Sequence, residues 1–124
     1  MGKRILVVDD EPDTVTFFTE VLQEHGYETS SATNGAEALE SVRAQRPDLV
    51  TLDITMPEQS GIRAFRELRE DESLKDIPVL MLTGVAPDFK KFISSRRNLA
   101  APDGYIEKPV RPEALLREVR RLIG

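Results

Sequence analysis

The stretch DLVTLDITMPEQSG, residues 48–61, begins as an apolar run that is interrupted by one carboxylate, Asp53. A short, continuous apolar run is typical of a parallel strand that is covered on both faces. The pair Met56-Pro57 and the polar residues after it predict a turn before the next helix. We therefore expect a buried strand over residues 48–52 that carries Asp53 at its carboxyl end.

Apolar runs and amphipathic stretches alternate along the whole chain. Residues 4–8 and 78–82 predict two more buried parallel strands. Residues 27–32 and 104–107 are more polar and predict edge strands. Five strands that alternate with five helices predict an α/β fold, a three-layer sandwich with right-handed crossovers. Helical spacing and start signals predict the helices over residues 11–25, 35–45, 61–71, 87–97 and 111–123.

Length and composition exclude several classes of protein. The 124 residues fit one domain spanning residues 1–124, and 40% hydrophobic with 31% charged residues is typical of a globular protein. The chain has no Cys and one histidine, His25, which excludes disulfides, thiolate chemistry and histidine-rich metal sites. Any metal ion would therefore take oxygen ligands.

The N-terminus and the charge distribution limit the location and the partners. The first ten residues, MGKRILVVDD, reach carboxylates after four apolar residues, so we expect neither a signal peptide nor a membrane span, and a cytoplasmic location. The net charge is −5: residues 1–62 carry 4 basic and 12 acidic side chains, and residues 63–124 carry 13 and 10. Nucleic-acid-binding domains usually have a basic surface overall. We therefore expect no direct contact with nucleic acid or membrane.

Polar side chains follow four of the five predicted strands. Asp9 and Asp10 follow the first strand, and Asp53 follows the third. Thr83 ends the fourth strand region, and Lys108 follows the fifth. Ligands bind beyond the carboxyl ends of such strands, where three neighbouring carboxylates would repel one another. A divalent cation with oxygen ligands relieves that repulsion, which favours Mg²⁺, with Mn²⁺ as an alternative. The lysine ammonium would offset the acids and suits a phosphoryl oxygen.

Each of these residues also has a plainer interpretation when taken alone. Asp10 resembles the N-cap of a helix that has Pro12 in its first turn. Asp53 fits a turn-forming acid, and Thr83 fits a simple connection between strand and helix. Lys108 fits a solvated surface residue. The ordered set of acids, hydroxyl and lysine, each at a strand end, is what favours one shared site.

With these motifs the sequence resembles the receiver domain of two-component response regulators. The resemblance extends from ILVVDDEP through LVTLDITMPEQSG and IPVLMLTG to YIEKP. It implies a doubly wound, flavodoxin-like parallel sheet of order 2-1-3-4-5. It also implies a signalling switch rather than an enzyme, phosphorylated in a Mg²⁺-dependent transfer from a sensor histidine kinase or a phosphotransfer protein.

The resemblance assigns roles to individual residues. Asp53 is the implied phosphoacceptor, and Asp9 and Asp10 are the acidic pair that holds Mg²⁺. The backbone carbonyl of Thr55 is an implied further metal ligand, and Lys108 the implied contact to the phosphoryl group. The bond between this lysine and the following proline is implied to be cis.

The implied switch depends on Thr83, whose hydroxyl would bind the phosphoryl group, and on Tyr105, its aromatic partner. The surface formed by the fourth helix, the fifth strand and the fifth helix would then change. That surface would serve a downstream effector, an output domain or a homodimer that forms on phosphorylation. Thr55 and Val85 depart from the polar pairs that assist hydrolysis in the family, so we expect slow self-dephosphorylation. Phe17 is a candidate contact for the phosphodonor, with a core role as the alternative.

Two rival functions remain open at this stage. Asp53-Ile54-Thr55 faintly resembles the nucleophile motif of Mg²⁺-dependent phosphohydrolases of the haloacid dehalogenase type. Those enzymes carry the motif on the first strand and usually need a longer chain. A receiver-like module that signals without phosphorylation would be expected to lack one of the acids or the lysine, and all are present here.

Overall fold

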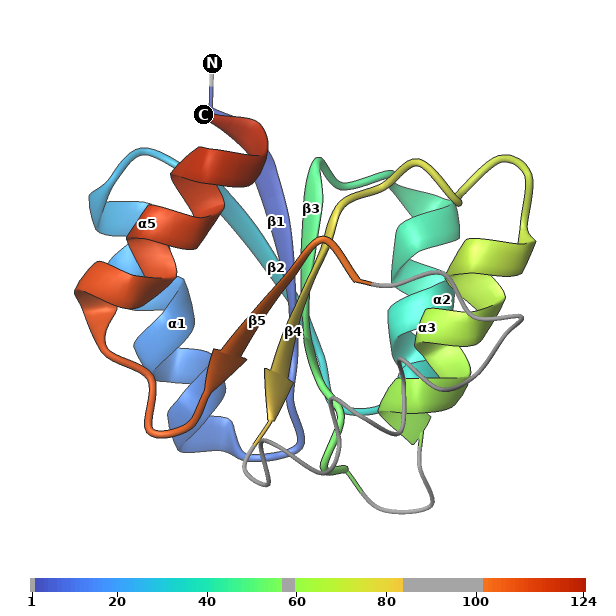
Figure 1. Cartoon of the computed structure of the whole chain (residues 1–124), viewed down its shortest axis with the longest axis horizontal. Helices are drawn as coiled ribbons and strands as arrows, with labels where there is room; N and C mark the ends of the chain where they lie inside the picture. Colours follow the sequence, from blue (N-terminus) through green and yellow to red (C-terminus); the bar gives the residue numbers. More distant parts are fainter. Residues whose placement is uncertain (1, 57–59, 84–101) are drawn as a thin grey trace.

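The computed structural model describes residues 2–56, 60–83 and 102–124, which form a five-stranded sheet between two layers of helices (Figure 1). All neighbouring strands are parallel, and their order is β2-β1-β3-β4-β5, which confirms the predicted order. The strands are β1 (Arg4–Val8), β2 (Glu28–Ala32), β3 (Leu49–Asp53), β4 (Val79–Thr83) and β5 (Gly104–Glu107).

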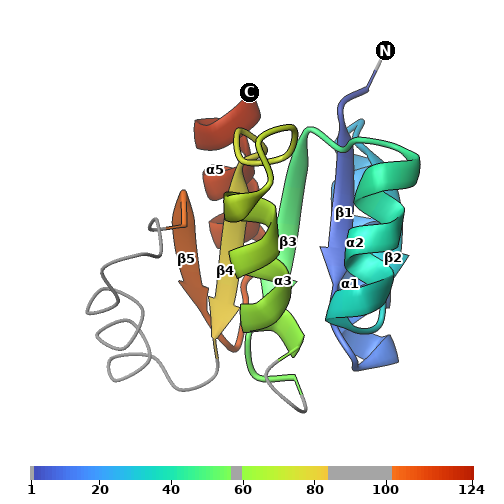
Figure 2. The same ribbon diagram turned by 90° about the vertical axis from the view of Figure 1, so that its right-hand side faces the viewer.

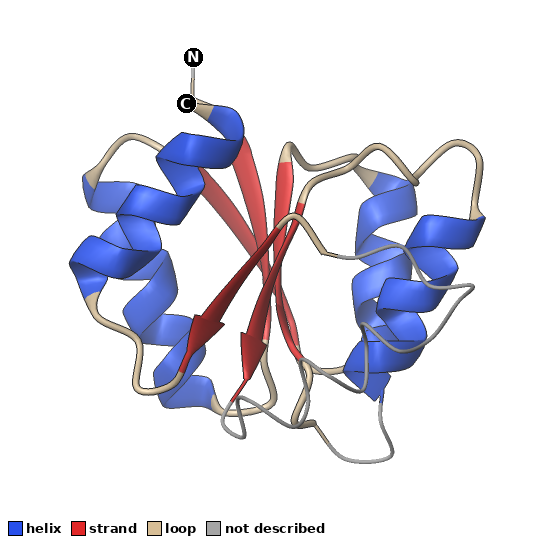
Figure 3. Cartoon of the chain, in the orientation of Figure 1, coloured by secondary structure: helices blue, strands red, loops and turns tan. Residues whose placement is uncertain are grey.

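Helices cover both faces of the sheet, as Figure 3 shows by colour. The described helices are α1 (Pro12–Glu24), α2 (Gly35–Ala44), α3 (Ser60–Glu70) and α5 (Pro112–Ile123). Helices α1 and α5 lie on one face, and α2 and α3 lie on the other (Figure 1). The helix predicted over residues 87–97 lies outside the described residues. No helix in the described part of the chain has the length and apolar character that a membrane crossing requires.

The hydrophobic core consists of two clusters, one on each face of the sheet. In β1, Leu6 and Val8 belong to the cluster under α2 and α3, whereas Ile5 and Val7 belong to the cluster under α1 and α5. Every residue of β3 and β4 is buried, as predicted for central strands covered on both sides. Side-chain alternation along the strands therefore decides which helical layer each strand residue faces.

Two predicted local features differ from the structure. Strands β3 and β4 end one residue later than predicted, so Asp53 and Thr83 are themselves the last strand residues, because pairing continues to Asp53 opposite Leu82. The alternative interpretation of Asp10 as a helix N-cap is wrong, since α1 begins at Pro12 and Glu11 is its N-cap. The parallel strands bring these ends together at one edge of the sheet (Figure 2).

Thr51, in the middle of β3, is fully buried, and its hydroxyl has no hydrogen-bond partner within the described parts of the chain. A buried hydroxyl without a partner costs about 1–3 kcal/mol. Thr51→Val keeps the branched shape and removes the hydroxyl. We expect this variant to gain about 1 kcal/mol in free energy of unfolding, measured by urea denaturation. An unchanged or lower free energy of unfolding would show that the buried hydroxyl does not destabilise the fold.

Candidate functional site

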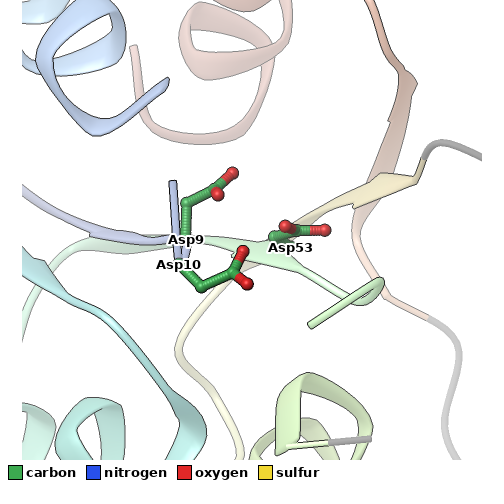
Figure 4. A group of neighbouring side chains, drawn as sticks. All are labelled: Asp9, Asp10 and Asp53. Atoms are coloured by element: carbon green, nitrogen blue, oxygen red, sulfur yellow. The ribbon is translucent and has the colours of Figure 1, made fainter. Parts of the chain in front are cut away.

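Three carboxylates gather where β1 and β3 end (Figure 4). One ligand atom of each of Asp9, Asp10 and Asp53 lies within 4.8 Å of the others. Asp9 and Asp53 are 0% and 1% exposed, whereas Asp10 is exposed to solvent. The cluster thus combines two acids held inside the fold with a third that solvent reaches, and all its side-chain donors are oxygens, the ligands that Mg²⁺ prefers.

Lys108 is the counter-charge of the two buried acids. Its Nζ lies 3.1 Å from Oδ2 of Asp9 and 3.2 Å from Oδ2 of Asp53. The backbone N–H of Lys108 donates to the Thr83 carbonyl at 2.8 Å, which fixes the lysine beside the end of β4. The peptide bond from Lys108 to Pro109 is cis, as expected. One ammonium therefore faces two buried carboxylates, which leaves the site with an excess of negative charge.

The other oxygen of each buried carboxylate is held by the local backbone. Asp9 Oδ1 accepts from the N–H of Glu11 at 2.9 Å, which explains why α1 starts only after that residue. Asp53 Oδ1 accepts from the N–H of Thr55 at 2.9 Å and from its hydroxyl at 2.7 Å. Both carboxylates are thereby fixed in orientation, with their Oδ2 atoms directed at the lysine.

The contact from the Thr55 hydroxyl was not anticipated from the sequence. A local signal exists, because Asp71 Oδ1 accepts in the same way from the N–H and the hydroxyl of Ser73, at 2.9 and 2.7 Å. An aspartate followed two residues later by Ser or Thr favours such a turn. The backbone carbonyl of Thr55, expected to bind metal, keeps that role as a prediction.

Burial and the excess of carboxylates over basic groups shift the pKa values of Asp9 and Lys108. Burial raises the pKa of Asp9, the charge of Asp53 raises it further, and the bonds from Glu11 and Lys108 offset this only in part. Burial alone would lower the pKa of Lys108, but its hydrogen bonds and attraction to the two carboxylates outweigh that effect and raise it. The lysine is thus firmly charged, while ionised Asp9 remains costly.

Asp9→Asn is expected to raise the free energy of unfolding at neutral pH when no divalent cation is present. The folded-state pKa of Asp9 lies above the unfolded one, so its contribution to stability is favourable at acid pH and is lost as pH rises through the folded pKa. The advantage of the asparagine variant should therefore grow from acid to neutral pH. Urea unfolding of both proteins at several pH values measures it, and a less stable variant at neutral pH would refute this electrostatic description.

Thr83 and Tyr105 lie on the other face of the sheet from the two buried acids. Thr83 is buried. It lies two residues after Met81 in β4, so the two side chains point to the same face of the sheet, and Met81 belongs to the cluster under α2 and α3. Tyr105 pairs with Met81 across the β4–β5 ladder, is half-buried, and packs against the same cluster. Burial raises the pKa of its phenol. Both expected switch residues thus share one face, while Val85 lies outside the described residues.

Phe17 packs against the core and is also partly exposed beside the acidic site. Its ring meets Phe18 edge to face at 5.8 Å and packs against the cluster under α1 and α5, yet remains only partly buried. It also lines a hollow of about 250 Å³ that contains Lys108 and Pro109. Phe17 therefore supports the core and still offers apolar surface beside the acidic site.

Comparison with known proteins decides the family. A family model described as the response regulator receiver domain matches residues 5–120. The chain belongs to this family. It is 32% identical to the polar-differentiation response regulator DivK of Brucella anthropi over 124 residues, which are 100% of this chain and 98% of DivK. The alkaline phosphatase synthesis transcriptional regulatory protein PhoP of Bacillus subtilis is 34% identical over 99% of this chain and 49% of PhoP.

A solved structure of a related receiver domain has the same fold as this chain. The receiver domain of a sensor histidine kinase from Pseudomonas aeruginosa PAO1 aligns with a TM-score of 0.87 and 30% identity, over 100% of this chain and 99% of that one. That structure has a magnesium ion coordinated in its active site cleft. This receiver domain is a phosphorylation-activated signalling switch of the two-component type. The phosphohydrolase and the phosphorylation-independent module are not favoured.

Proposed function

We propose that Asp53 is the phosphoacceptor and that its donor is a phosphohistidine of a sensor histidine kinase or a phosphotransfer protein. A carboxylate oxygen of Asp53 attacks phosphorus in line, an O–P bond forms, and the P–N bond to the donor histidine breaks. The observation that carries the proposal is the pair of fixed contacts on this one buried carboxylate. Thr55 holds Oδ1, and Lys108 lies 3.2 Å from Oδ2.

The side chains present fit a magnesium ion. Asp9, Asp10 and Asp53 would hold it together with the backbone carbonyl of Thr55, and Mn²⁺ would suit the same oxygen ligands. When bound, the ion would neutralise the excess negative charge of the site and stabilise the negative charge on the phosphoryl group during transfer. The related receiver from Pseudomonas aeruginosa, with magnesium in its active site cleft, supports this assignment.

Lys108 has a second task once the phosphoryl group is attached. Its ammonium lies between Asp9 and Asp53 and can move from the carboxylate to a phosphoryl oxygen without leaving the site. Phosphoryl transfer depends on positioning and charge stabilisation more than on proton transfer. The domain would thus catalyse its own phosphorylation, with slow self-dephosphorylation because neither Thr55 nor Val85 readily directs water.

The signal would leave the site through Thr83 and Tyr105. The Thr83 hydroxyl would bind a phosphoryl oxygen, and Tyr105, on the same face of the sheet, would turn inward. The surface of β5, α5 and the helix predicted over residues 87–97 would then recruit an effector, an output domain or a second copy. We place this switch in a single domain over residues 1–124, acting in the cytoplasm.

Incubation with acetyl phosphate and Mg²⁺, followed by intact mass measurement, tests this function. We expect the protein to gain the mass of one phosphoryl group, and to gain nothing when EDTA removes the divalent cation. A stable adduct that forms equally well with EDTA would contradict the role of the acidic cluster. Release of phosphate in many turnovers, without a protein adduct, would support the phosphohydrolase instead.

A further inference from the structure

β5 is an edge strand of only four residues, and two functional side chains depend on its placement. Tyr105 lies within it, and Lys108 follows its last residue. Among the described strands it pairs with β4 alone. A slip by one residue would turn Tyr105 to the other face of the sheet and would move Lys108 about 3.3 Å along the strand direction. The register of β5 on β4 therefore decides whether Lys108 meets the acidic cluster.

The sequence of β5 specifies that register only weakly. Gly104 has no side chain, Glu107 is exposed, and Tyr105 is half-buried. Of the four described residues of the strand, Ile106 thus provides the one buried apolar side chain. A strand with little apolar patterning is prone to slip along its neighbour. Contacts at the two ends of β5 are therefore needed to fix its position.

Asp103 provides the contacts at the amino end of β5. Its backbone N–H donates to the carbonyl of Val79 at 3.0 Å, and its Oδ2 accepts from the N–H of Val79 at 2.8 Å. Its own carbonyl accepts from Nη2 of Arg121 on α5 at 2.8 Å. Both hydrogen-bonding groups of the Asp103 backbone thus have partners, and its carboxylate is joined to the first residue of β4.

Arg69 of α3 binds the same carboxylate oxygen. Its Nη2 lies 2.6 Å from Oδ2 of Asp103. Its Nη1 donates to the carbonyls of Lys75 at 3.1 Å and Ile77 at 2.9 Å, both of which lie between α3 and β4. The guanidinium lies 5.0 Å from the centroid of the Phe65 ring. The Arg69 side chain is only 10% exposed, so salt screens this ion pair less than it screens a surface pair.

We propose that the ion pair of Arg69 with Asp103 fixes the register of β5 on β4, and that Arg69 is thereby a positioning residue for phosphoryl transfer. The pair ties α3 and the start of β4 to the residue that enters β5. At the other end of the strand, the N–H of Lys108 donates to the carbonyl of Thr83 at 2.8 Å. A correctly placed start of β5 therefore brings the lysine to the two buried acids. The role in transfer rests on the proposed function, whereas the role in register does not.

Arg69→Met, which keeps an unbranched apolar stem and removes the guanidinium, tests both roles. We expect hydrogen exchange of the Lys108 amide, measured by NMR, to become about tenfold faster, because local opening of β5 no longer breaks a charged hydrogen bond. Phosphorylation by acetyl phosphate and Mg²⁺ should be slowed about tenfold, since misplacement by about 1 Å can cost about a hundredfold in rate. The Kd for Mg²⁺, measured by calorimetry, should not increase, because the acids of the cluster belong to β1 and β3 or directly follow them.

Two control variants separate register from stability and from lost charge. Val42→Ala truncates a buried side chain of α2, which packs on β1 and β2. It should lower the free energy of unfolding and leave the rate of phosphorylation unchanged. Arg43→Met removes an exposed arginine that pairs with Asp71 at 3.6 Å, and should change neither the rate nor the exchange of the Lys108 amide.

Asp103→Asn is a milder second variant, because its amide oxygen can still accept from the N–H of Val79. It should change exchange and rate in the same direction as Arg69→Met. Normal exchange of the Lys108 amide in either folded variant would overturn the role in register. Faster exchange with an unchanged rate, or a rate that falls equally in Val42→Ala, would overturn the positioning role. A wild type that forms no adduct would refute the proposed function and the positioning role with it, while exchange still decides the register.

Discussion

Asp53→Asn is expected to abolish phosphorylation by acetyl phosphate and Mg²⁺, whereas Asp71→Asn is expected to leave it unchanged. An amide oxygen is a poor nucleophile, so the substitution removes the attacking group. It should preserve the fold, because the asparagine oxygen can still accept the two hydrogen bonds from Thr55. Intact mass measured over a time course provides the comparison.

Asp71 is a suitable control because the local structure around its carboxylate resembles that around Asp53. Its carboxylate accepts from the N–H and hydroxyl of Ser73 with the same 2.9 and 2.7 Å distances that Thr55 gives to Asp53. It differs because its carboxylate pairs with Arg43, at 3.6 Å, and because it is not part of the carboxylate cluster found among the described residues. An adduct that persists in Asp53→Asn would exclude Asp53 as the sole acceptor. Loss of the adduct in Asp71→Asn would show that the assay reports folding rather than chemistry.

Lys108→Met is expected to slow phosphorylation by about a hundredfold or more, as does the loss of one charged or hydrogen-bonding group from a preorganised site. It should also destabilise the metal-free protein by about 3 kcal/mol, because two buried carboxylates lose their counter-charge. Magnesium should recover much of this stability, since a ligand at a hundred times its Kd contributes about 2.7 kcal/mol. Phosphorylation rates and urea unfolding with and without Mg²⁺ measure both effects.

Lys75→Met provides the control for Lys108. Lys75 forms an ion pair with Glu72 at 2.9 Å, but both side chains are largely exposed, so little change in rate or stability is expected. Equal effects of the two substitutions would mean that the loss of any lysine charge is responsible. A Lys108→Met protein with normal rate and stability would contradict the charge balance derived for the site.

The order of elements could be predicted because each central strand is buried on both faces and is therefore uniformly apolar. The runs at residues 4–8 and 78–82 stand out from the amphipathic helices for this reason. The ends of β3 and β4 were harder to predict. Asp53 and Thr83 are polar, as loop residues usually are, yet both still pair in the sheet. Hydrogen bonding of the backbone, rather than hydropathy, decides where β3 and β4 end.

The gathering of acids and lysine was predictable because strand ends meet at one edge of a parallel sheet. The different exposure of Asp9 and Asp10 was not, since both follow the end of β1 and no sequence pattern shows which of them turns inward to Lys108. The contact of Arg69 with Asp103, 2.6 Å long, was also missed. These two residues are far apart in the sequence, and no local pattern pairs them.

Borohydride reduction of the phosphorylated protein, followed by peptide mass spectrometry, tests most directly whether the phosphoryl group is carried by the Asp53 carboxylate. Hydride converts an aspartyl phosphate to homoserine and leaves a free aspartate unchanged. We predict homoserine at residue 53, in an amount that matches the phosphorylated fraction, and unchanged aspartate at residues 9, 10 and 71. Homoserine at another position, or a phosphorylated protein that yields none, would contradict the assignment.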